Sequence, residues 1–158
     1  AEMLSGVKNL DMLSPEERRL YATIQILGGN ESRGIDVLKN DSDAASSLFL
    51  ATVYRMTKKN TEAILEYRKA LEKAGDDETK MLIHFNLGKI YFSQSLAMEA
   101  AKEFSDAISF SPGKAVLRVW AGKSFAVLGD KAKAREYWLE ALKLEPDNTE
   151  VKKLLEGH

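Results

Sequence analysis

Side chains able to carry out acid–base or metal chemistry are few in this sequence. There are two histidines and no cysteine, and Asp76 and Asp77 are adjacent carboxylates. His84 has no histidine, cysteine or carboxylate three or four residues further along, which is the spacing that places a second ligand on the same helix face. We interpret His84 as packing between helices and the aspartates as caps of helix starts. We therefore expect no catalytic residue and no metal site.

Glycine and lysine give no sign of a cofactor. Neither Gly28–Gly29 nor Ser111–Gly113 resembles a phosphate loop, because neither is followed, at the required spacing, by a lysine with a serine or threonine after it. Basic clusters such as Lys58–Lys59 and Lys152–Lys153 are interleaved with glutamates, as on a solvated helix face. With 23 basic and 24 acidic side chains the net charge is −1, so no overall field attracts a polyanion. We expect no cofactor, no nucleic-acid partner and no membrane insertion.

Length and composition are those of an ordinary globular domain, with 158 residues, 44% apolar and 30% charged. The lack of cysteine excludes disulfides, a thiol nucleophile and a thiolate zinc site. The chain begins with alanine, and residues 156–158 resemble the remnant of an expression tag, so we interpret it as an excised segment. The compartment is left open: a cytoplasmic location is favoured, and a periplasmic or membrane-anchored parent protein remains an alternative.

An internal repeat is the strongest pattern in the chain. Small residues, aromatic residues and a proline recur 34 residues further along: Gly88 as Gly122, Tyr91 as Phe125, Ala100 as Ala134, Phe104 as Trp138, Ala107 as Ala141, and Pro112 as Pro146. A similar pattern lies upstream at a step of 37, where Leu50, Tyr54, Ala63, Tyr67 and Ala70 match Leu87, Tyr91, Ala100, Phe104 and Ala107. A period of this length is typical of stacked helix pairs.

The residue types within each repeat fit two antiparallel helices. Alanine and glycine allow two helix backbones to approach, and rings three or four residues further on lie on the same face. Ser14 and Glu17 predict a capping box opening a helix that runs to Gly28, followed by a short helix at 31–40. Further helices are predicted at 44–57, 61–74, 78–93, 97–110, 114–128, 131–144 and 148–156, with N-caps at Asp43, Asn60, Asp130 and Asn148 and helix ends at Gly75 and Gly129.

On these residues the sequence resembles the tetratricopeptide repeat family, whose unit carries small residues at positions 8, 20 and 27, aromatics at 11 and 24, and proline near 32. The resemblance departs from the pattern at Ala51 and Gly75, and at position 4, where Ser47, His84 and Arg118 replace the usual tryptophan. It implies an all-α fold, a right-handed α-solenoid of antiparallel helix pairs forming one domain over 1–158. The expected parts are an N-terminal segment with a degenerate helix pair (1–43), units 44–77, 81–114 and 115–148, and a capping helix 149–155.

The resemblance also implies a concave groove, lined by the first helix of each unit, that binds a peptide or partner protein. The expected groove residues are Phe49, Thr52, Arg55, Phe85, Asn86, Lys89, Phe92, Trp120 and Lys123. The inward positions include three basic residues and no aspartate or glutamate, so a mildly positive groove is expected. Such a groove would suit an acidic peptide with apolar anchors, and Asn86 would hydrogen-bond the peptide backbone.

Two features of the groove qualify this prediction. Leu82, Phe85 and Phe92 form an apolar stripe beyond what one buried face of helix 78–93 needs, and either the neighbouring repeat or a ligand covers it. Family members that hold the acidic C-termini of heat-shock chaperones share a five-residue carboxylate clamp, of which only Asn86 is matched here. That specialised function is therefore rejected.

The predicted function is a noncatalytic interaction module or scaffold, and no enzymatic activity is expected. One alternative is a self-assembling oligomer, docking through the groove, the first unit or the N-terminal apolar residues Met3, Leu4, Val7 and Leu10. Another is a regulatory repeat segment of a larger protein. The sequence does not identify the partner or the number of repeats in the parent protein.

Overall fold

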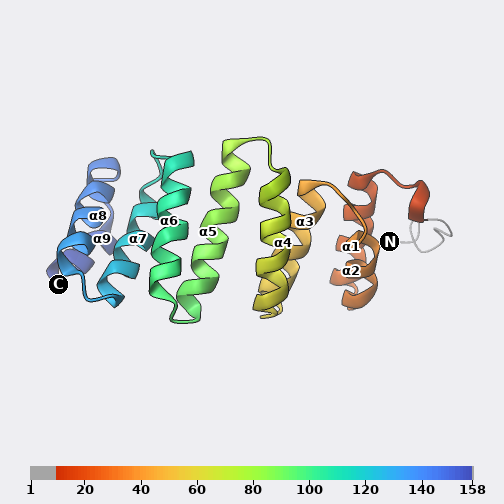
Figure 1. The fold of residues 1–158 in the computed structure, drawn as a ribbon, viewed down its shortest axis with the longest axis horizontal. Helices are drawn as coiled ribbons and strands as arrows, with labels where there is room; N and C mark the ends of the chain where they lie inside the picture. The colour runs from red at the N-terminus through yellow and green to blue at the C-terminus, as the bar shows by residue number, and fades with distance from the viewer. Residues whose placement is uncertain (1–9, 158) are drawn as a thin grey trace. The chain divides into compact units, whose positions relative to one another are not determined.

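The computed structural model describes residues 10–157, and within that range it contains helices and connecting turns without strands (Figure 1). Contacts divide the chain into two compact units, with the boundary between Lys73 and Ala74. This boundary precedes Gly75, close to the place where the repeat step lengthens. A single domain over 1–158 therefore stays a prediction.

The first unit contains two packed helix pairs, α1 with α2 and α3 with α4. Its elements are the 3₁₀ turn η1 (Leu10–Met12), α1 (Pro15–Leu27), α2 (Glu31–Leu38), α3 (Ala44–Met56) and α4 (Asn60–Lys73). The predicted capping box is confirmed: the Ser14 amide donates to Glu17 Oε2 at 2.8 Å, and the Glu17 amide donates to Ser14 Oγ at 3.2 Å. Met3, Leu4 and Val7 lie outside the described residues.

A close helix approach explains Gly34 in the degenerate pair. A Cβ there would lie 2.8 Å from the backbone oxygen of Ala22 and 2.7 Å from the Ile26 side chain. Ala22 is itself fully buried. The glycine that departs from the repeat pattern therefore allows α2 to pack more tightly on α1 than alanine would.

Asp43 links the start of α3 to α1. Its Oδ1 accepts from the Ser46 amide at 2.9 Å, which confirms the predicted N-cap, and from Arg19 Nη1 at 2.9 Å. Nearby, Arg18 Nε lies 2.7 Å from Asp41 Oδ1, and Ser46 Oγ donates to Asp41 Oδ2 at 2.9 Å. Burial of Asp43 raises its pKa, but the hydrogen bonds from Ser46 and the charge of Arg19 outweigh this, and the pKa is lowered.

This lowered pKa predicts a pH-dependent contribution to stability. Because the folded-state pKa of Asp43 lies below its unfolded value, its stabilisation is full well above pH 4 and is lost as the pH falls through the folded-state pKa. Asp43→Asn keeps the cap but removes the charge, and should reduce the free energy of unfolding at pH 7 by about 0.5–1 kcal/mol, since the carboxylate is 36% exposed. Urea denaturation should show a smaller difference from wild type at pH 3 than at pH 7; an unchanged difference would contradict the assignment.

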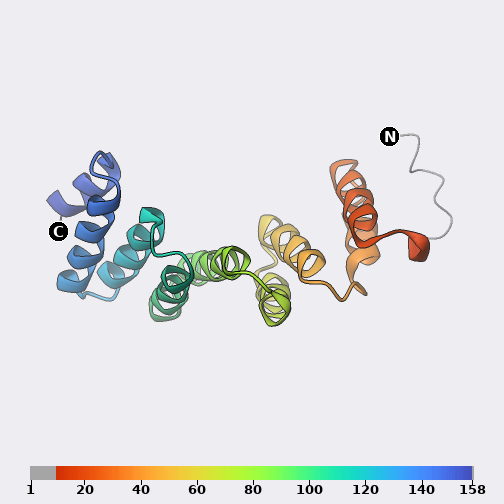
Figure 2. The same cartoon turned by 90° about the horizontal axis from the view of Figure 1, so that it is seen from above.

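The second unit stacks five helices, each packed on the next (Figure 2). They are α5 (Asp77–Ser93), α6 (Ala97–Phe110), α7 (Ala115–Val127), α8 (Lys131–Leu144) and α9 (Thr149–Glu156). Side chains of Asp76, Asp130 and Asn148 accept the amides of Thr79, Lys133 and Val151 at 2.8, 3.0 and 3.1 Å, so these caps are confirmed. Among the described helices, none combines the length and apolarity needed to cross a bilayer.

One predicted cap was wrong. Asn60 is the first residue of α4, and the Ala63 amide donates to Lys59 O at 3.0 Å, so the N-cap position falls on Lys59. The turn before it is made by Lys58, whose φ of 59° lies in the left-handed region, and by a hydrogen bond from the Lys59 amide to Tyr54 O at 2.8 Å. This backbone turn places the helix start at Asn60, where a capping side chain would have to come from the residue before it.

Glycine faces a buried ring in two helix pairs of the second unit, α5–α6 and α7–α8. A Cβ on Gly88 would lie 2.7 Å from the Phe104 ring, and one on Gly122 would overlap Trp138. Phe104 and Trp138 are fully buried, and Trp138 Nε1 donates to Val119 O at 3.3 Å. The expected pairing of small residues with large rings is therefore confirmed in α5–α6 and α7–α8.

Candidate partner-binding surface

Five of the expected groove residues lie together in the second unit and are called the Trp120 cluster: Phe85, Lys89 and Phe92 on α5, and Trp120 and Lys123 on α7. Lys123 Nζ lies 4.7 Å from the centroid of the Trp120 ring. Lys89 Nζ lies 5.6 Å from the centroids of both Trp120 and Phe85. The ammonium groups of both lysines thus lie at distances from the Trp120 ring that are typical of cation–π contacts.

Helical spacing explains why these residues converge. Phe85, Lys89 and Phe92 are separated by four and three residues on α5, and Trp120 and Lys123 by three residues on α7. Each set therefore lies on one face of its helix. Both α5 and α7 pack against α6, which lies between them in the chain.

The aromatic residues of the Trp120 cluster pack against one another and against a buried ring. Trp120 makes an edge-to-face contact with Phe92, with centroids 5.4 Å apart, and lies 5.8 Å from the buried Phe104 ring. Phe85 lies 5.9 Å from the same Phe104 ring. Neighbouring helices therefore cover Phe85 and Phe92 in part, whereas Leu82, the third member of the apolar stripe, remains 42% exposed.

A hollow of about 260 Å³ adjoins the cluster. Its lining is mainly apolar and comes from Phe92, Lys123, Ala126, Val127, Trp138 and Leu154. Val127 is 62% exposed at its edge. Leu154 lies on α9, so the terminal helix contributes to the surface, which the sequence analysis of first helices alone had missed.

Glu150 of α9 changes the expected charge of the surface. Its Oε1 lies 2.6 Å from Lys123 Nζ, so a carboxylate does approach the groove although none occupies its inward positions. Glu150 is 57% exposed, and an ion pair of this kind contributes at most about 1 kcal/mol. A ligand carboxylate can therefore compete with Glu150 for Lys123 at small energetic loss.

The remaining predicted groove residues are less clearly placed for binding. Asn86 Nδ2 donates to Leu82 O of its own helix at 2.8 Å, so one of its two N–H donors is already engaged. On α3, in the first unit, Thr52 Oγ1 donates to Leu48 O at 2.9 Å, and Phe49 packs against the α2–α3 core. Arg55 is half-buried, and its Nε has no hydrogen-bond partner among the described residues. That these α3 residues join the Trp120 cluster in one surface stays a prediction.

Comparison with solved structures places the fold among tetratricopeptide repeats. The chain is similar to the crystal structure of MamA, with a TM-score of 0.74 and 19% identity over 94% of this chain and 85% of that one. It is similar to the first TPR of Spaghetti (RPAP3) bound to the HSP90 peptide SRMEEVD, with a TM-score of 0.63 and 22% identity over 74% of this chain and 94% of that one. It is also similar to the N-terminal domain of stress-induced protein-1 (STI-1) from C. elegans, with a TM-score of 0.65 and 21% identity over 72% of this chain and 92% of that one.

No protein-family model matches the sequence, and the search of curated proteins gives no match. The structural likenesses, at 19–22% identity, establish the fold. The resemblance read from the repeat residues is thereby confirmed: the chain has the all-α fold of successive antiparallel helix pairs that defines tetratricopeptide repeats.

Proposed function

We propose that this chain is a noncatalytic interaction module and that the Trp120 cluster, with its adjoining hollow, binds a peptide segment of a partner protein. The observation that carries the proposal is the placement of Lys89 and Lys123 on one indole ring beside an apolar hollow. Tryptophan is one of the residue types enriched in interface hot spots, and the two ammonium groups beside it can attract a carboxylate. A binding role also agrees with the fold, which in one similar structure holds a peptide.

The chemistry of the surface favours an acidic peptide with an apolar anchor. A ligand carboxylate can pair with Lys89 or Lys123, while an apolar side chain fills the hollow between Phe92 and Leu154. The peptide in the RPAP3 structure, SRMEEVD, combines acidic residues with methionine and valine. Because four of the five carboxylate-clamp positions hold other residue types here, the acidic groups would be held by the Trp120 cluster instead.

A random-peptide display library provides a test with a defined probe. Selection on the whole chain should enrich peptides that contain acidic and apolar residues, because both parts of the surface must be satisfied. The double variant Lys89→Glu/Lys123→Glu should lower the affinity of the selected peptides at least about tenfold, because the new carboxylates repel the acidic groups that the lysines attract. Affinity would be measured by fluorescence anisotropy and folding by thermal denaturation.

The matched control reverses two lysines on second helices, Lys102 of α6 and Lys143 of α8, both exposed. Lys102→Glu/Lys143→Glu makes the same change in net charge and should leave peptide affinity unchanged. Equal losses in the two double variants would mean that overall charge, and not this surface, attracts the peptides. A loss of affinity matched by loss of folding in the first variant would make the two lysines structural.

A further inference from the structure

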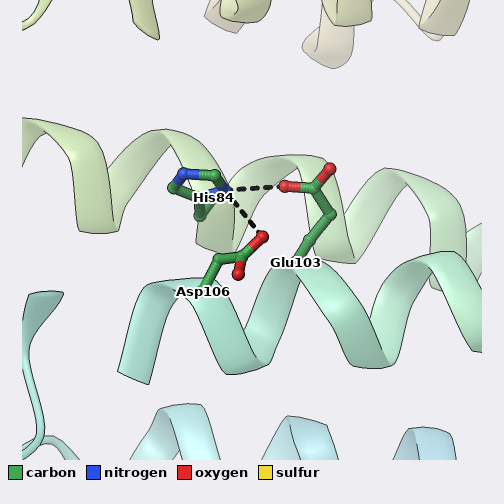
Figure 3. A group of neighbouring side chains, drawn as sticks. All are labelled: His84, Glu103 and Asp106. Atoms are coloured by element: carbon green, nitrogen blue, oxygen red, sulfur yellow. Dashed lines mark hydrogen bonds and ion pairs between the residues drawn. The ribbon is translucent and has the colours of Figure 1, made fainter. Parts of the chain in front are cut away.

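His84, Glu103 and Asp106 converge outside the Trp120 cluster, where α5 packs on α6 (Figure 3). His84 Nδ1 lies 2.7 Å from Glu103 Oε2 and 3.9 Å from Asp106 Oδ2. One potential ligand atom from each residue lies within 4.8 Å of the others. Among the described residues, this is the one group of three such side chains that meets this distance.

We propose that these three side chains form a binding site for a divalent transition-metal ion of the zinc class. The sequence analysis found no second ligand for His84 because it considered only the next turn of the same helix. Both carboxylates come instead from α6, where Glu103 and Asp106 are three residues apart and so share a face. His84 reaches that face from α5, as Figure 3 shows.

The separations suit a small coordination sphere. Zinc bonds of about 2.0–2.1 Å in a tetrahedron place neighbouring ligand atoms about 3.3 Å apart. The observed separations of 2.7 and 3.9 Å lie on either side of this value, so small side-chain rotations would bring the three atoms into range. A metal ion bound at Nδ1 requires that this nitrogen carry no proton, so the neutral ring of the bound form carries its proton on Nε2.

Burial and charge also fit a cation. The side chains of His84 and Glu103 are 12% and 8% exposed, so the ion would sit in a partly dry environment. Asp106 is 42% exposed, which leaves a route from solvent and room for water as the fourth ligand. Two carboxylates neutralise the charge of a divalent ion, and burial makes that attraction stronger than it would be in water.

An aromatic ring and a lysine lie beside the imidazole ring of His84. Phe110 stacks on His84 with centroids 5.6 Å apart and planes 15° apart. Lys80, one turn earlier on α5, directs its ammonium at the Phe110 ring, 5.5 Å from the centroid, and lies 3.8 Å from Asp77. Imidazole with carboxylates selects Zn²⁺, Co²⁺ or Ni²⁺ over Ca²⁺ and Mg²⁺, which prefer all-oxygen sites.

Zinc binding to the whole chain tests the proposal. Metal-free protein would be titrated with Zn²⁺ in competition with a chromophoric chelator, and one Zn²⁺ per chain is expected, with no comparable binding of Ca²⁺. His84→Phe, which keeps a ring against Phe110, and Asp106→Asn should each weaken Zn²⁺ binding at least about tenfold. Zn²⁺ should raise the thermal unfolding temperature of wild type but not of these variants, because binding to the folded state alone stabilises it.

Two controls separate this site from other zinc ligands. His158→Gln removes the only other imidazole in the chain, and Glu99→Gln removes an exposed carboxylate one turn before Glu103 on α6. Both variants should bind Zn²⁺ as wild type does. Absence of one-to-one binding, or binding that survives in His84→Phe and disappears in His158→Gln, would overturn the proposal.

Discussion

Trp138→Ala is expected to lower the free energy of unfolding of the 74–158 unit by about 3–5 kcal/mol. The indole is fully buried in a cluster with Ala134, Val151 and other apolar residues of α7, α8 and α9. Its removal leaves a cavity at the crossing of α7 and α8 and withdraws the surface on which α9 packs. Since domains are stable by about 5–15 kcal/mol, a loss of this size should be visible as a large shift in urea denaturation.

A double-mutant cycle with Gly122 tests the physical reason for this effect. Gly122→Ala alone should destabilise by about 1–3 kcal/mol, because its Cβ meets Trp138, with the Cδ1 atom at 2.6 Å, and lies 3.0 Å from Ala134 O. In the Trp138→Ala background the ring is gone, and the added methyl group should be nearly neutral or stabilising. If the two substitutions had additive effects, with no interaction energy between the sites, then the lack of a Cβ at Gly122 would not be what makes room for the indole.

The fold was predictable because each level of the sequence specifies the same arrangement. Periodic apolar residues and caps such as Asp130 define the helices, and the 34-residue step from Gly88 to Gly122 identifies equivalent crossings. Small residues facing rings then encode which helices pack together. The misplaced cap at Asn60 shows the limit of this reasoning, because a left-handed Lys58 gave no signal in its residue type.

The candidate site was predictable only where it depends on one helix face. Lys89, Trp120 and Lys123 follow from positions within first helices, and they do lie together. Leu154 and Glu150 reach the same surface because α9 packs back on α8, a tertiary relation that helix periodicity does not encode. The partners of His84 were missed for the same reason, since Glu103 and Asp106 approach it from another helix.

Trp120→Ala should separate binding from folding. Trp120 is half-buried and forms the centre of the cluster, in contact with Phe92 and beneath both lysines. Truncation of an aromatic interface anchor removes about 2 kcal/mol or more of binding free energy, which corresponds to an approximately 30-fold weaker affinity. Peptides selected on the wild-type chain should lose at least this much affinity in fluorescence anisotropy.

Phe125→Ala provides the matched control. Phe125 lies on the same helix as Trp120 and is also half-buried, but its ring stacks on the Tyr137 ring, with the two centroids 5.5 Å apart. It should weaken folding without changing peptide affinity measured below its unfolding transition. Trp120→Ala should show the opposite balance, with a smaller loss of stability than Trp138→Ala and a larger loss of binding than Phe125→Ala. Equal binding by Trp120→Ala and wild type would exclude the indole as the anchor, since Trp120 is the ring, among the described residues, that both Lys89 and Lys123 approach.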